Sequence, residues 1–364
     1  MKRSLTLLSL FFLFSFAEAQ TVSTFLNIAA TKVDDAMILD SQGNLFGSHY
    51  NGSRVYKITP AGVVSEFASG FNTPNGLAFD SQENLFVCDL FGNRIYKLSI
   101  SGQFLDTIFI GSPSGIVKMP NSDTMIFTQY LNSNLNKLAP DGSIIQTHSG
   151  SPLDGPIGLA YSDTGILYVA NFNDRKILEV SSAALNYVAT LLGSTSAWLG
   201  FITYASSSIW ATGVNDHRIY RVYPNYVDSV ILYAGSSSGG ANGHISIAKF
   251  TTPNGILGSE GGDSLYISEF NTGRIRIISG LGATGIYDVD QNDFEIDLFP
   301  NPCTDWINVR SNEIIKEISI FDINGKQVLK TDRSTMDIKE FPAGKYCLKV
   351  FSRQGVSHAS FIKN

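Results

Sequence analysis

Three polar residues of the sequence stand in the same local setting, directly before a residue with a small side chain. Asn75 and Asn254 each precede a glycine in the letters TPNG, and Asp35 precedes an alanine. Carboxylate and amide oxygens are the ligands that a hard cation such as Ca²⁺ prefers. If the fold brings Asp35, Asn75 and Asn254 together, they form a candidate metal site. The alternative is that an asparagine before glycine serves a turn, because both residues favour turn conformations.

A second set of polar residues follows, each at the end of a strand-like apolar run. His49, Asp89, Asn171 and Glu269 close these runs, which include NLFVCD, ILYVAN and SLYISE. Imidazole, amide and carboxylate groups at the mouth of a cavity can orient a ligand by hydrogen bonds, so these four are candidate ligand-binding residues. The alternative is local, because Asp and Asn side chains often bind the backbone of their own loop.

Both sets belong to an internal repeat. Six copies align on one apolar residue at spacings of 40, 40, 42, 42 and 56 residues. The aligned residues are Val55, Ile95, Leu135, Ile177, Ile219 and Ile275. A period of this size is typical of propeller blades or solenoid repeats, and each copy contains four short strand patterns separated by polar turns, as one propeller blade does. The sequence therefore predicts an all-β chain built on a six-bladed β-propeller.

A basic residue precedes the aligned position in five of the six copies, namely Arg54, Arg94, Lys176, Arg218 and Arg274. Its aliphatic stem can lie along an aromatic ring while its charge reaches a carboxylate or a carbonyl oxygen. We therefore predict a structural role for this column of the repeat.

The ring has to close, because an open array exposes a strand edge at each end. The last copy supplies three strands, and TVSTFL at Thr21 to Leu26 resembles the fourth strand, VVSEFA, of the first copy. We expect the N-terminal segment to complete the last blade. In a closed ring the first, second and last blades are neighbours. The candidate metal residues then meet at one side of the channel mouth, on the top face. Glu269, His49 and Asp89 are expected to lie behind them.

The sequence pattern PNGLAFD…NLFVCD…NRIYKL resembles the NHL repeat of six-bladed propellers, and the resemblance covers about residues 21–280. The chain is similar to gluconolactonases and regucalcin-like proteins of this fold in its Asn-Gly context. That resemblance implies a divalent cation held by Glu, Asn and Asp, which activates water or polarises a lactone carbonyl. Asp35 replaces the expected glutamate, and Ile157 and Leu199 are apolar where further ligands are expected. A weaker resemblance to virginiamycin B lyase implies a histidine at the channel mouth, for which His49 is the candidate.

The two ends of the chain carry export signals. Two basic residues, an apolar run over residues 5–16 and an Ala-Glu-Ala site are typical of a secretory signal peptide. FPNP, GKQV and PAGKYCLKV, in this order, resemble the type A C-terminal sorting domain of type IX secretion cargo from Bacteroidetes-type bacteria. This implies handling by the type IX machinery, then surface attachment or release. The predicted division is signal peptide 1–19, propeller 20–283, linker 284–293 and β-sandwich sorting domain 294–364.

Composition excludes several other classes. The 364-residue chain has a formal net charge of −6, so nucleic acid is not an expected partner. No apolar run reaches the ~20 residues that span a bilayer, so no transmembrane segment is expected. Three cysteines are too few for a disulfide framework. Whether Cys303 and Cys347 pair is left open, because the sequence does not give their separation.

Two main functions are compatible with these residues, beside the weaker resemblance to a lyase that would use His49. The first is an exported or cell-surface binding module that recognises a carbohydrate, a peptide or a small molecule at the top face of the propeller, without catalysis. The alternative is a metal-dependent hydrolase of the gluconolactonase type, with Ca²⁺ at the candidate metal site. No complete catalytic set can be named. The sequence therefore does not decide whether the protein is an enzyme, and no cofactor is certain.

Overall fold

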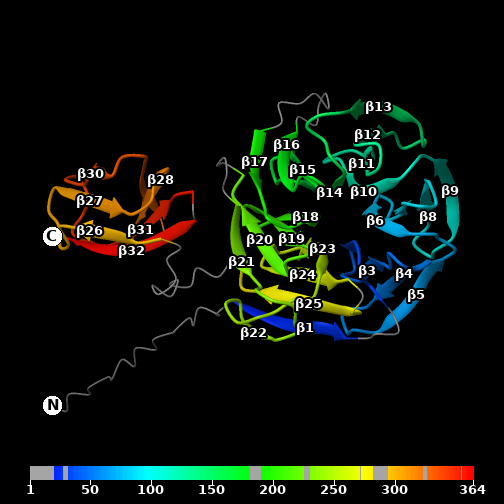
Figure 1. Cartoon of the computed structure of the whole chain (residues 1–364), viewed down its shortest axis with the longest axis horizontal. Helices are drawn as coiled ribbons and strands as arrows, with labels where there is room; N and C mark the ends of the chain where they lie inside the picture. Colours follow the sequence, from blue (N-terminus) through cyan, green and yellow to red (C-terminus); the bar gives the residue numbers. More distant parts are fainter. Residues whose placement is uncertain are drawn as a thin grey trace, which may run out of the picture.

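The computed structural model describes residues 20–27, 32–180, 190–224, 230–270, 272–281, 294–322, 326–353 and 355–364. Every regular element in these residues is a β-strand, and none of them forms a helix long and apolar enough to cross a membrane. The strands form a ring of sheets around a channel and a smaller C-terminal group (Figure 1). The predicted signal peptide and linker lie outside the described residues, so their boundaries stay predictions.

Within the described residues, the ring consists of six antiparallel sheets, one for each copy of the repeat. The first three sheets contain β2 (Met37–Leu39), β3 (Leu45–Ser48), β4 (Arg54–Ile58) and β5 (Val64–Ser69); β6 (Pro74–Phe79), β7 (Leu85–Asp89), β8 (Arg94–Leu98) and β9 (Phe104–Phe109); and β10 (Pro113–Lys118), β11 (Met125–Gln129), β12 (Asn134–Leu138) and β13 (Ile144–Ser149). The next two contain β14 (Pro156–Tyr161), β15 (Leu167–Asn171), β16 (Lys176–Val180) and β17 (Thr190–Ser194); and β18 (Leu199–Ala205), β19 (Ser208–Gly213), β20 (Arg218–Val222) and β21 (Val230–Ala234). The sixth contains β22 (Gly243–His244), β1 (Thr21–Asn27), β25 (Arg274–Ser279), β24 (Ser264–Glu269) and β23 (Pro253–Gly258). The predicted propeller fold is confirmed.

The first strand of each repeat lines the channel. Each of these strands contacts the first strand of the next sheet, and β23 contacts β2, so the ring is closed. A Cβ atom added to Gly115 would lie 1.8 Å from the carbonyl oxygen of Ile157 in the next sheet, and one added to Gly255 would lie 2.0 Å from the carbonyl oxygen of Asp35. In five of the six repeats the inner strands thus approach too closely for a side chain, which explains the glycine at this position, whereas the first repeat accommodates the Cβ atom of Ala36.

The N-terminal strand belongs to the last sheet, as expected. β1 pairs antiparallel with β25, and its Val22 and Leu26 side chains are buried. The glycine-rich insertion before the last repeat joins the same sheet, because β22 pairs with the other edge of β1. The insertion therefore covers an edge of the closing strand that would otherwise be open to solvent.

The basic column has the predicted structural role. Arg94 lies over the rings of Tyr96 and Phe109 and donates to the carbonyl oxygen of Gly92. The other four basic residues each pair with a carboxylate of their own repeat. These contacts tie the third strand of a blade to the neighbouring strands and loops of the same blade, as a structural role requires.

The C-terminal group is a small antiparallel sandwich with its own core. Its two sheets contain β26 (Ile296–Phe299), β27 (Trp306–Ser311) and β30 (Thr335–Asp337); and β29 (Gln327–Thr331), β28 (Glu317–Phe321), β31 (Gly344–Phe351) and β32 (Val356–Lys363). Buried side chains from both sheets, including Ile307, Ile320 and Leu348, pack together. Cys88, Cys303 and Cys347 are all free, so the open question of a Cys303–Cys347 bond is answered in the negative in this structure.

Candidate functional site

A cavity of about 300 Å³ lies at the channel mouth. Each of the six repeats contributes one residue before or near the start of its first strand and one residue just after its second strand, and the fifth and sixth repeats add one more each. The lining residues are Asp35, Tyr50, Asn75, Leu90, Ser114, Tyr130, Ile157, Phe172, Trp198, Phe201, Val214, Thr252, Asn254 and Phe270. The repeat therefore concentrates twelve strand ends around one opening, as the sequence predicted for the first set of residues.

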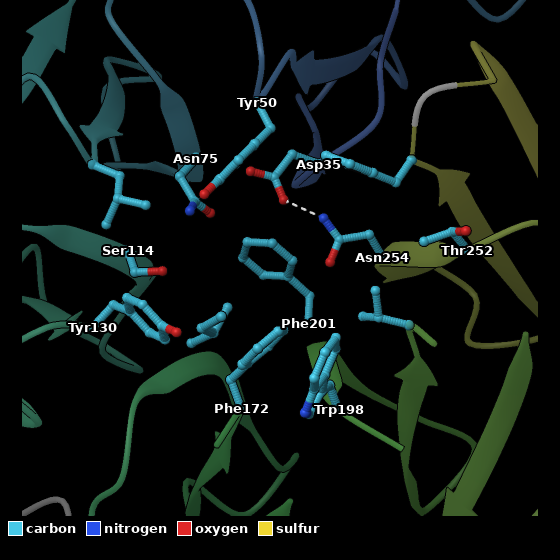
Figure 2. Close-up of a pocket in the computed structure, with 14 residues that line it drawn as sticks. Asp35, Tyr50, Asn75, Ser114, Tyr130, Phe172, Trp198, Phe201, Thr252 and Asn254 are labelled. Atoms are coloured by element: carbon cyan, nitrogen blue, oxygen red, sulfur yellow. Dashed lines mark hydrogen bonds between the residues drawn. The ribbon is translucent and has the colours of Figure 1, made fainter. Parts of the chain in front are cut away.

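The polar groups gather on one side of this cavity. Asn254, Asp35, Asn75 and Ser114 come from four consecutive sheets of the ring, and Figure 2 shows them along one wall. Asn254 Nδ2 donates to Asp35 Oδ1 at 2.7 Å. Among the described residues, the buried atoms Asp35 Oδ2, Asn75 Oδ1 and Ser114 Oγ have no hydrogen-bond partner. Because buried polar atoms are nearly always paired, three unpaired oxygens at one cavity are available to bond a molecule that enters it.

The aromatic rings of Phe172 and Trp198 form the opposite wall, and the ring of Phe201 lies in the middle of the view between the two walls (Figure 2). The rings of Phe172 and Trp198 are stacked, with centroids 5.5 Å apart and an interplanar angle of 24°. Tyr130 meets Phe172 edge to face at 6.0 Å. This wall offers a flat apolar surface, on which an apolar or aromatic group packs well.

Hydroxyl groups on the second strands hold the polar wall in place. Ser268 Oγ donates to the carbonyl oxygen of Asp35, in the next sheet, at 2.7 Å. In the same way, Ser48 Oγ donates to the carbonyl oxygen of Asn75 at 2.7 Å. Thr212 Oγ1 donates to the carbonyl oxygen of Asn254, also at 2.7 Å. These bonds between blades fix the backbone of Asp35, Asn75 and Asn254 relative to one another, which is what a binding site requires.

The electrostatics of the cavity are dominated by one buried carboxylate. Asp35 is 1% exposed, and none of the described lining residues is Lys, Arg or His. Burial raises the pKa of Asp35 well above its usual value of 3.8, and the neighbouring charge of Asp34 raises it further, while the hydrogen bond from Asn254 lowers it. These shifts disfavour the charged form of Asp35, which, when ionised, has no positive partner among the described lining residues.

This pKa shift predicts the stability of an isosteric variant. We expect Asp35→Asn to stabilise the folded protein at neutral pH by about 1–2 kcal/mol, because it removes an unpaired buried charge. The folded-state pKa lies above the unfolded-state pKa, so the wild type loses stability as the pH rises from about 3.8 towards the raised value. The stabilisation by the variant is thus absent below this window and complete above it. Thermal unfolding of both proteins from acid to neutral pH measures it, and a gain of the same size at every pH would contradict it.

The candidate ligand-binding residues lie outside the cavity lining. Asp89 accepts hydrogen bonds from the backbone amides of Thr73, at 2.6 Å, and Gly92, at 3.2 Å. Asn171 Nδ2 donates to the carbonyl oxygen of Pro152 at 2.8 Å. Both side chains bind backbone of the loops beside them, which is the local alternative considered for these positions.

Glu269 and His49 have protein partners as well. Glu269 is fully buried and accepts bonds from Arg274 Nε at 2.6 Å and Arg276 Nη1 at 3.1 Å. His49 Nε2 lies 4.0 Å from Asp34 Oδ2. Burial lowers the pKa of His49 below 6.5, while the charge of Asp34 opposes this shift. A ligand role for these four residues stays a prediction, and their observed contacts are those of loop anchors.

The residue directly after each of the four lines the cavity instead. These residues are Tyr50, Leu90, Phe172 and Phe270, and the sequence analysis did not single them out. The sequence pattern that could have revealed them is a large apolar or aromatic residue directly after the polar residue that ends the second strand in each repeat. The residues that follow it in these segments are mostly polar. Such a column at a loop is unusual, because loops are mostly polar and solvated.

The candidate metal residues do meet, since Asp35, Asn75 and Asn254 all line the cavity. Their donor set is short for Ca²⁺, which usually takes about six to eight oxygen ligands. The polar wall offers the carboxylate of Asp35 and neutral oxygens, and the described residues contain no group of three or more His, Cys, Asp or Glu residues placed to hold a metal ion. These residues therefore fit a divalent cation poorly, and the metal site stays a prediction.

Comparison with known proteins separates the two parts of the chain. Residues 297–364 match the family model of the secretion system C-terminal sorting domain. The search of curated proteins found no match for the chain. Solved structures match the propeller part at low identity, so these likenesses show the fold alone.

Three of these structures illustrate the range of proteins with this fold. An auxiliary nutrient binding protein from Bacteroides thetaiotaomicron has 14% identity and a TM-score of 0.59, over 71% of this chain and 76% of that chain. A gluconolactonase from Xanthomonas campestris has 18% identity and a TM-score of 0.55, over 71% and 89%. Virginiamycin B lyase from Staphylococcus aureus has 17% identity and a TM-score of 0.52, over 68% and 80%. The chain is thus a β-propeller that ends in a sorting domain for type IX secretion, which directs it to the cell surface or the extracellular space.

Proposed function

We propose that the exported propeller is a binding module that takes a small molecule into the cavity at its channel mouth. The proposal rests on one observation, the pairing of an aromatic wall with three unpaired buried oxygens across a single cavity. The aromatic wall binds an apolar face of the ligand, and polar groups of the ligand satisfy the oxygens. A volume of about 300 Å³ is at the lower end of the roughly 300–1,000 Å³ of small-molecule pockets, so the ligand is compact.

The cavity chemistry favours binding over catalysis. Among the described lining residues, Asp35 is the only carboxylate, and none is a His, Cys or Lys that could act as a base or nucleophile beside it. The alternative, a metal-dependent hydrolase of the gluconolactonase type, is supported by the meeting of Asp35, Asn75 and Asn254. The short donor set counts against it. Fold similarity does not decide between these functions, because one fold supports many.

A ligand screen with matched variants tests the proposal. Thermal unfolding of the chain from Gln20 to its C-terminus, in the presence of a library of small metabolites, should identify compounds that raise the melting temperature. We expect Phe172→Ala to weaken the binding of such a compound by about 10-fold or more, because a central aromatic residue supplies much of the contact energy.

The control for this variant is Phe109→Ala, since Phe109 lies on the outer strand β9 and is 75% exposed. It should leave affinity unchanged. The proposal fails if no stabilising compound depends on Phe172. It also fails if Ca²⁺ supports turnover of a lactone panel that Asp35→Ala abolishes, because the hydrolase alternative then holds.

A further inference from the structure

We propose that the ligand of this cavity is a positively charged primary amine with an aromatic or aliphatic body. This inference rests on the binding function proposed above and adds the chemical class of the ligand. It combines three features of the cavity, namely its uncompensated charge, the kind of hydrogen-bonding atoms left unpaired and the position of the aromatic wall.

The only charge that the cavity lining gains when Asp35 is ionised is negative. None of the described lining residues is Lys, Arg or His, and the Oδ2 atom of Asp35 has no hydrogen-bond partner. Behind it lies a second buried carboxylate, Asp34, which accepts a bond from the backbone amide of Tyr50 and lies 4.0 Å from His49 Nε2. Of the groups around this pair, Tyr50 is neutral, burial disfavours the charged form of His49, and the positive charges of Lys32 and Arg54 act on His49.

A buried carboxylate without a counter-charge is costly, because burial removes its hydration. In the low dielectric of a closed cavity, a cation at this point is attracted much more strongly than in water. A neutral sugar or alcohol would leave the charge of Asp35 uncompensated, and an anionic ligand would be repelled. A cationic ligand is therefore the one that the wall selects.

The unpaired atoms on the polar wall also suit an ammonium group. Asp35 Oδ2 and Asn75 Oδ1 can only accept when Asp35 is ionised, and Ser114 Oγ can accept as well. They come from three consecutive sheets and lie on the same side of the cavity in Figure 2. A primary ammonium group has three donors and no acceptor. It therefore matches this wall in number and in type of hydrogen bond.

The aromatic wall determines what is attached to the amine. Phe172 and Trp198 lie across the cavity from Asp35, and Tyr50 lies beside it (Figure 2). The face of Tyr50 can add a cation–π contact to the ammonium group. The stacked pair across the cavity accepts a flat or aliphatic body. The ligand thus spans the cavity with its charge at Asp35 and its apolar part at Trp198.

A matched pair of probes tests this inference. Phenethylamine is charged near neutral pH, and 2-phenylethanol has the same body with a neutral hydroxyl group. We expect calorimetric titration of the chain from Gln20 to its C-terminus to show phenethylamine binding at least about 10-fold more tightly than the alcohol. Asp35→Asn should weaken phenethylamine binding by about 30-fold or more, because one partner of a buried charge pair is lost, and should leave the alcohol nearly unaffected.

Two further variants keep the test sharp. Asn75→Ala should weaken phenethylamine binding more than alcohol binding, and circular dichroism checks that both cavity variants are folded. Asp106→Asn is the matched control, because Asp106 is exposed on the outer strand β9 and bonds only locally, to the backbone amide of Thr107, among its described contacts. It removes the same net charge from the protein and should change neither affinity.

The outcomes distinguish this inference from the proposed function. Equal affinity for amine and alcohol, or amine binding that survives Asp35→Asn, overturns the amine assignment while the binding function stands. Binding of neither probe also overturns the amine assignment, and the metabolite screen then judges the binding function by itself. Tight binding of Ca²⁺ that requires Asp35 and Asn75, without amine binding, overturns it in favour of a metal site.

Discussion

Glu269→Ala is expected to lower the free energy of unfolding of the propeller by about 3–5 kcal/mol, because it leaves buried positive charge without its partner. Glu269 Oε2 lies 2.6 Å from Arg274 Nε, and Glu269 Oε1 lies 3.1 Å from Arg276 Nη1. The side chains of Glu269 and Arg276 are 0% exposed. Urea unfolding of the two proteins measures the loss as a shift of the midpoint.

The effect is large because Arg276 joins separate parts of the last sheet. Its guanidinium group donates to the carbonyl oxygens of Lys249 and Ala241 and to Asn242 Oδ1, all in the glycine-rich insertion. Asn242 in turn accepts a bond from Thr24 of the N-terminal strand. In Glu269→Ala, Arg276 keeps its bonds to the insertion but loses the one carboxylate that pairs with it among the described residues. The cost of burying the charge of Arg276 is then no longer offset.

The first repeat supplies the control for this experiment. Arg54 and Glu66 form an ion pair with the same N–O distance, 2.6 Å, but both side chains are about half exposed, at 50% and 46%. Glu66→Ala should leave the midpoint nearly unchanged, because solvent screens an exposed pair. Equal losses in the two variants would show that burial is not the cause. Loss of ligand binding in Glu269→Ala with no change in stability would instead support the predicted ligand role of Glu269.

Removal of β1 is expected to abolish cooperative folding of the propeller. A chain that begins at residue 28 lacks the strand that pairs with β25, together with the buried side chains of Val22 and Leu26. Burial of these two is worth about 1.5–3 kcal/mol each, and the lost pairing with β25 adds to it. The total is comparable with the about 5–15 kcal/mol of net stability that most domains have. Size-exclusion chromatography and thermal unfolding should show an aggregating chain without a sharp transition, since β25 becomes an exposed edge.

A peptide makes the test specific to strand pairing. A synthetic peptide of residues 20–27 added to the shortened chain should restore a cooperative transition, because an extended peptide can add to an open sheet edge. The same peptide with Val22→Asp should fail, because this side chain is 2% exposed in the complete ring. If the shortened chain unfolds as sharply and at the same temperature as the longer one, the N-terminal strand does not hold the ring closed.

The fold and the export of this protein follow from sequence patterns that act locally. Each repeat alternates apolar and polar residues and places a small residue where inner strands meet, so the propeller can be recognised from the period. Glycine is needed at this position in the other five blades, whereas the first blade has Ala36, because an added Cβ atom at a glycine such as Gly115 or Gly255 would overlap the carbonyl oxygen of the next strand. The sorting domain is recognised from three motifs in order, because an address signal is carried by its own residues.

The candidate site is only partly determined by sequence. The meeting of Asp35, Asn75 and Asn254 follows from ring closure and was predicted. The direction of the residues at the ends of the second strands was not. A polar residue there can be satisfied by a ligand or by a neighbouring loop, and only the tertiary structure shows that the backbone amide of Thr73 lies 2.6 Å from Asp89.

The sequence by itself determined that Asp35, Asn75 and Asn254 meet at the channel mouth, because chain order and closure place one repeat beside the next. The tertiary structure decided the chemistry of that mouth. It directs the ring of Phe172, rather than the side chain of Asn171, into the cavity. It also leaves Asp35 buried without a positive partner among the described lining residues. The physical reason is that hydration and charge compensation depend on every group packed around an atom, and those groups come from blades that are far apart in the sequence.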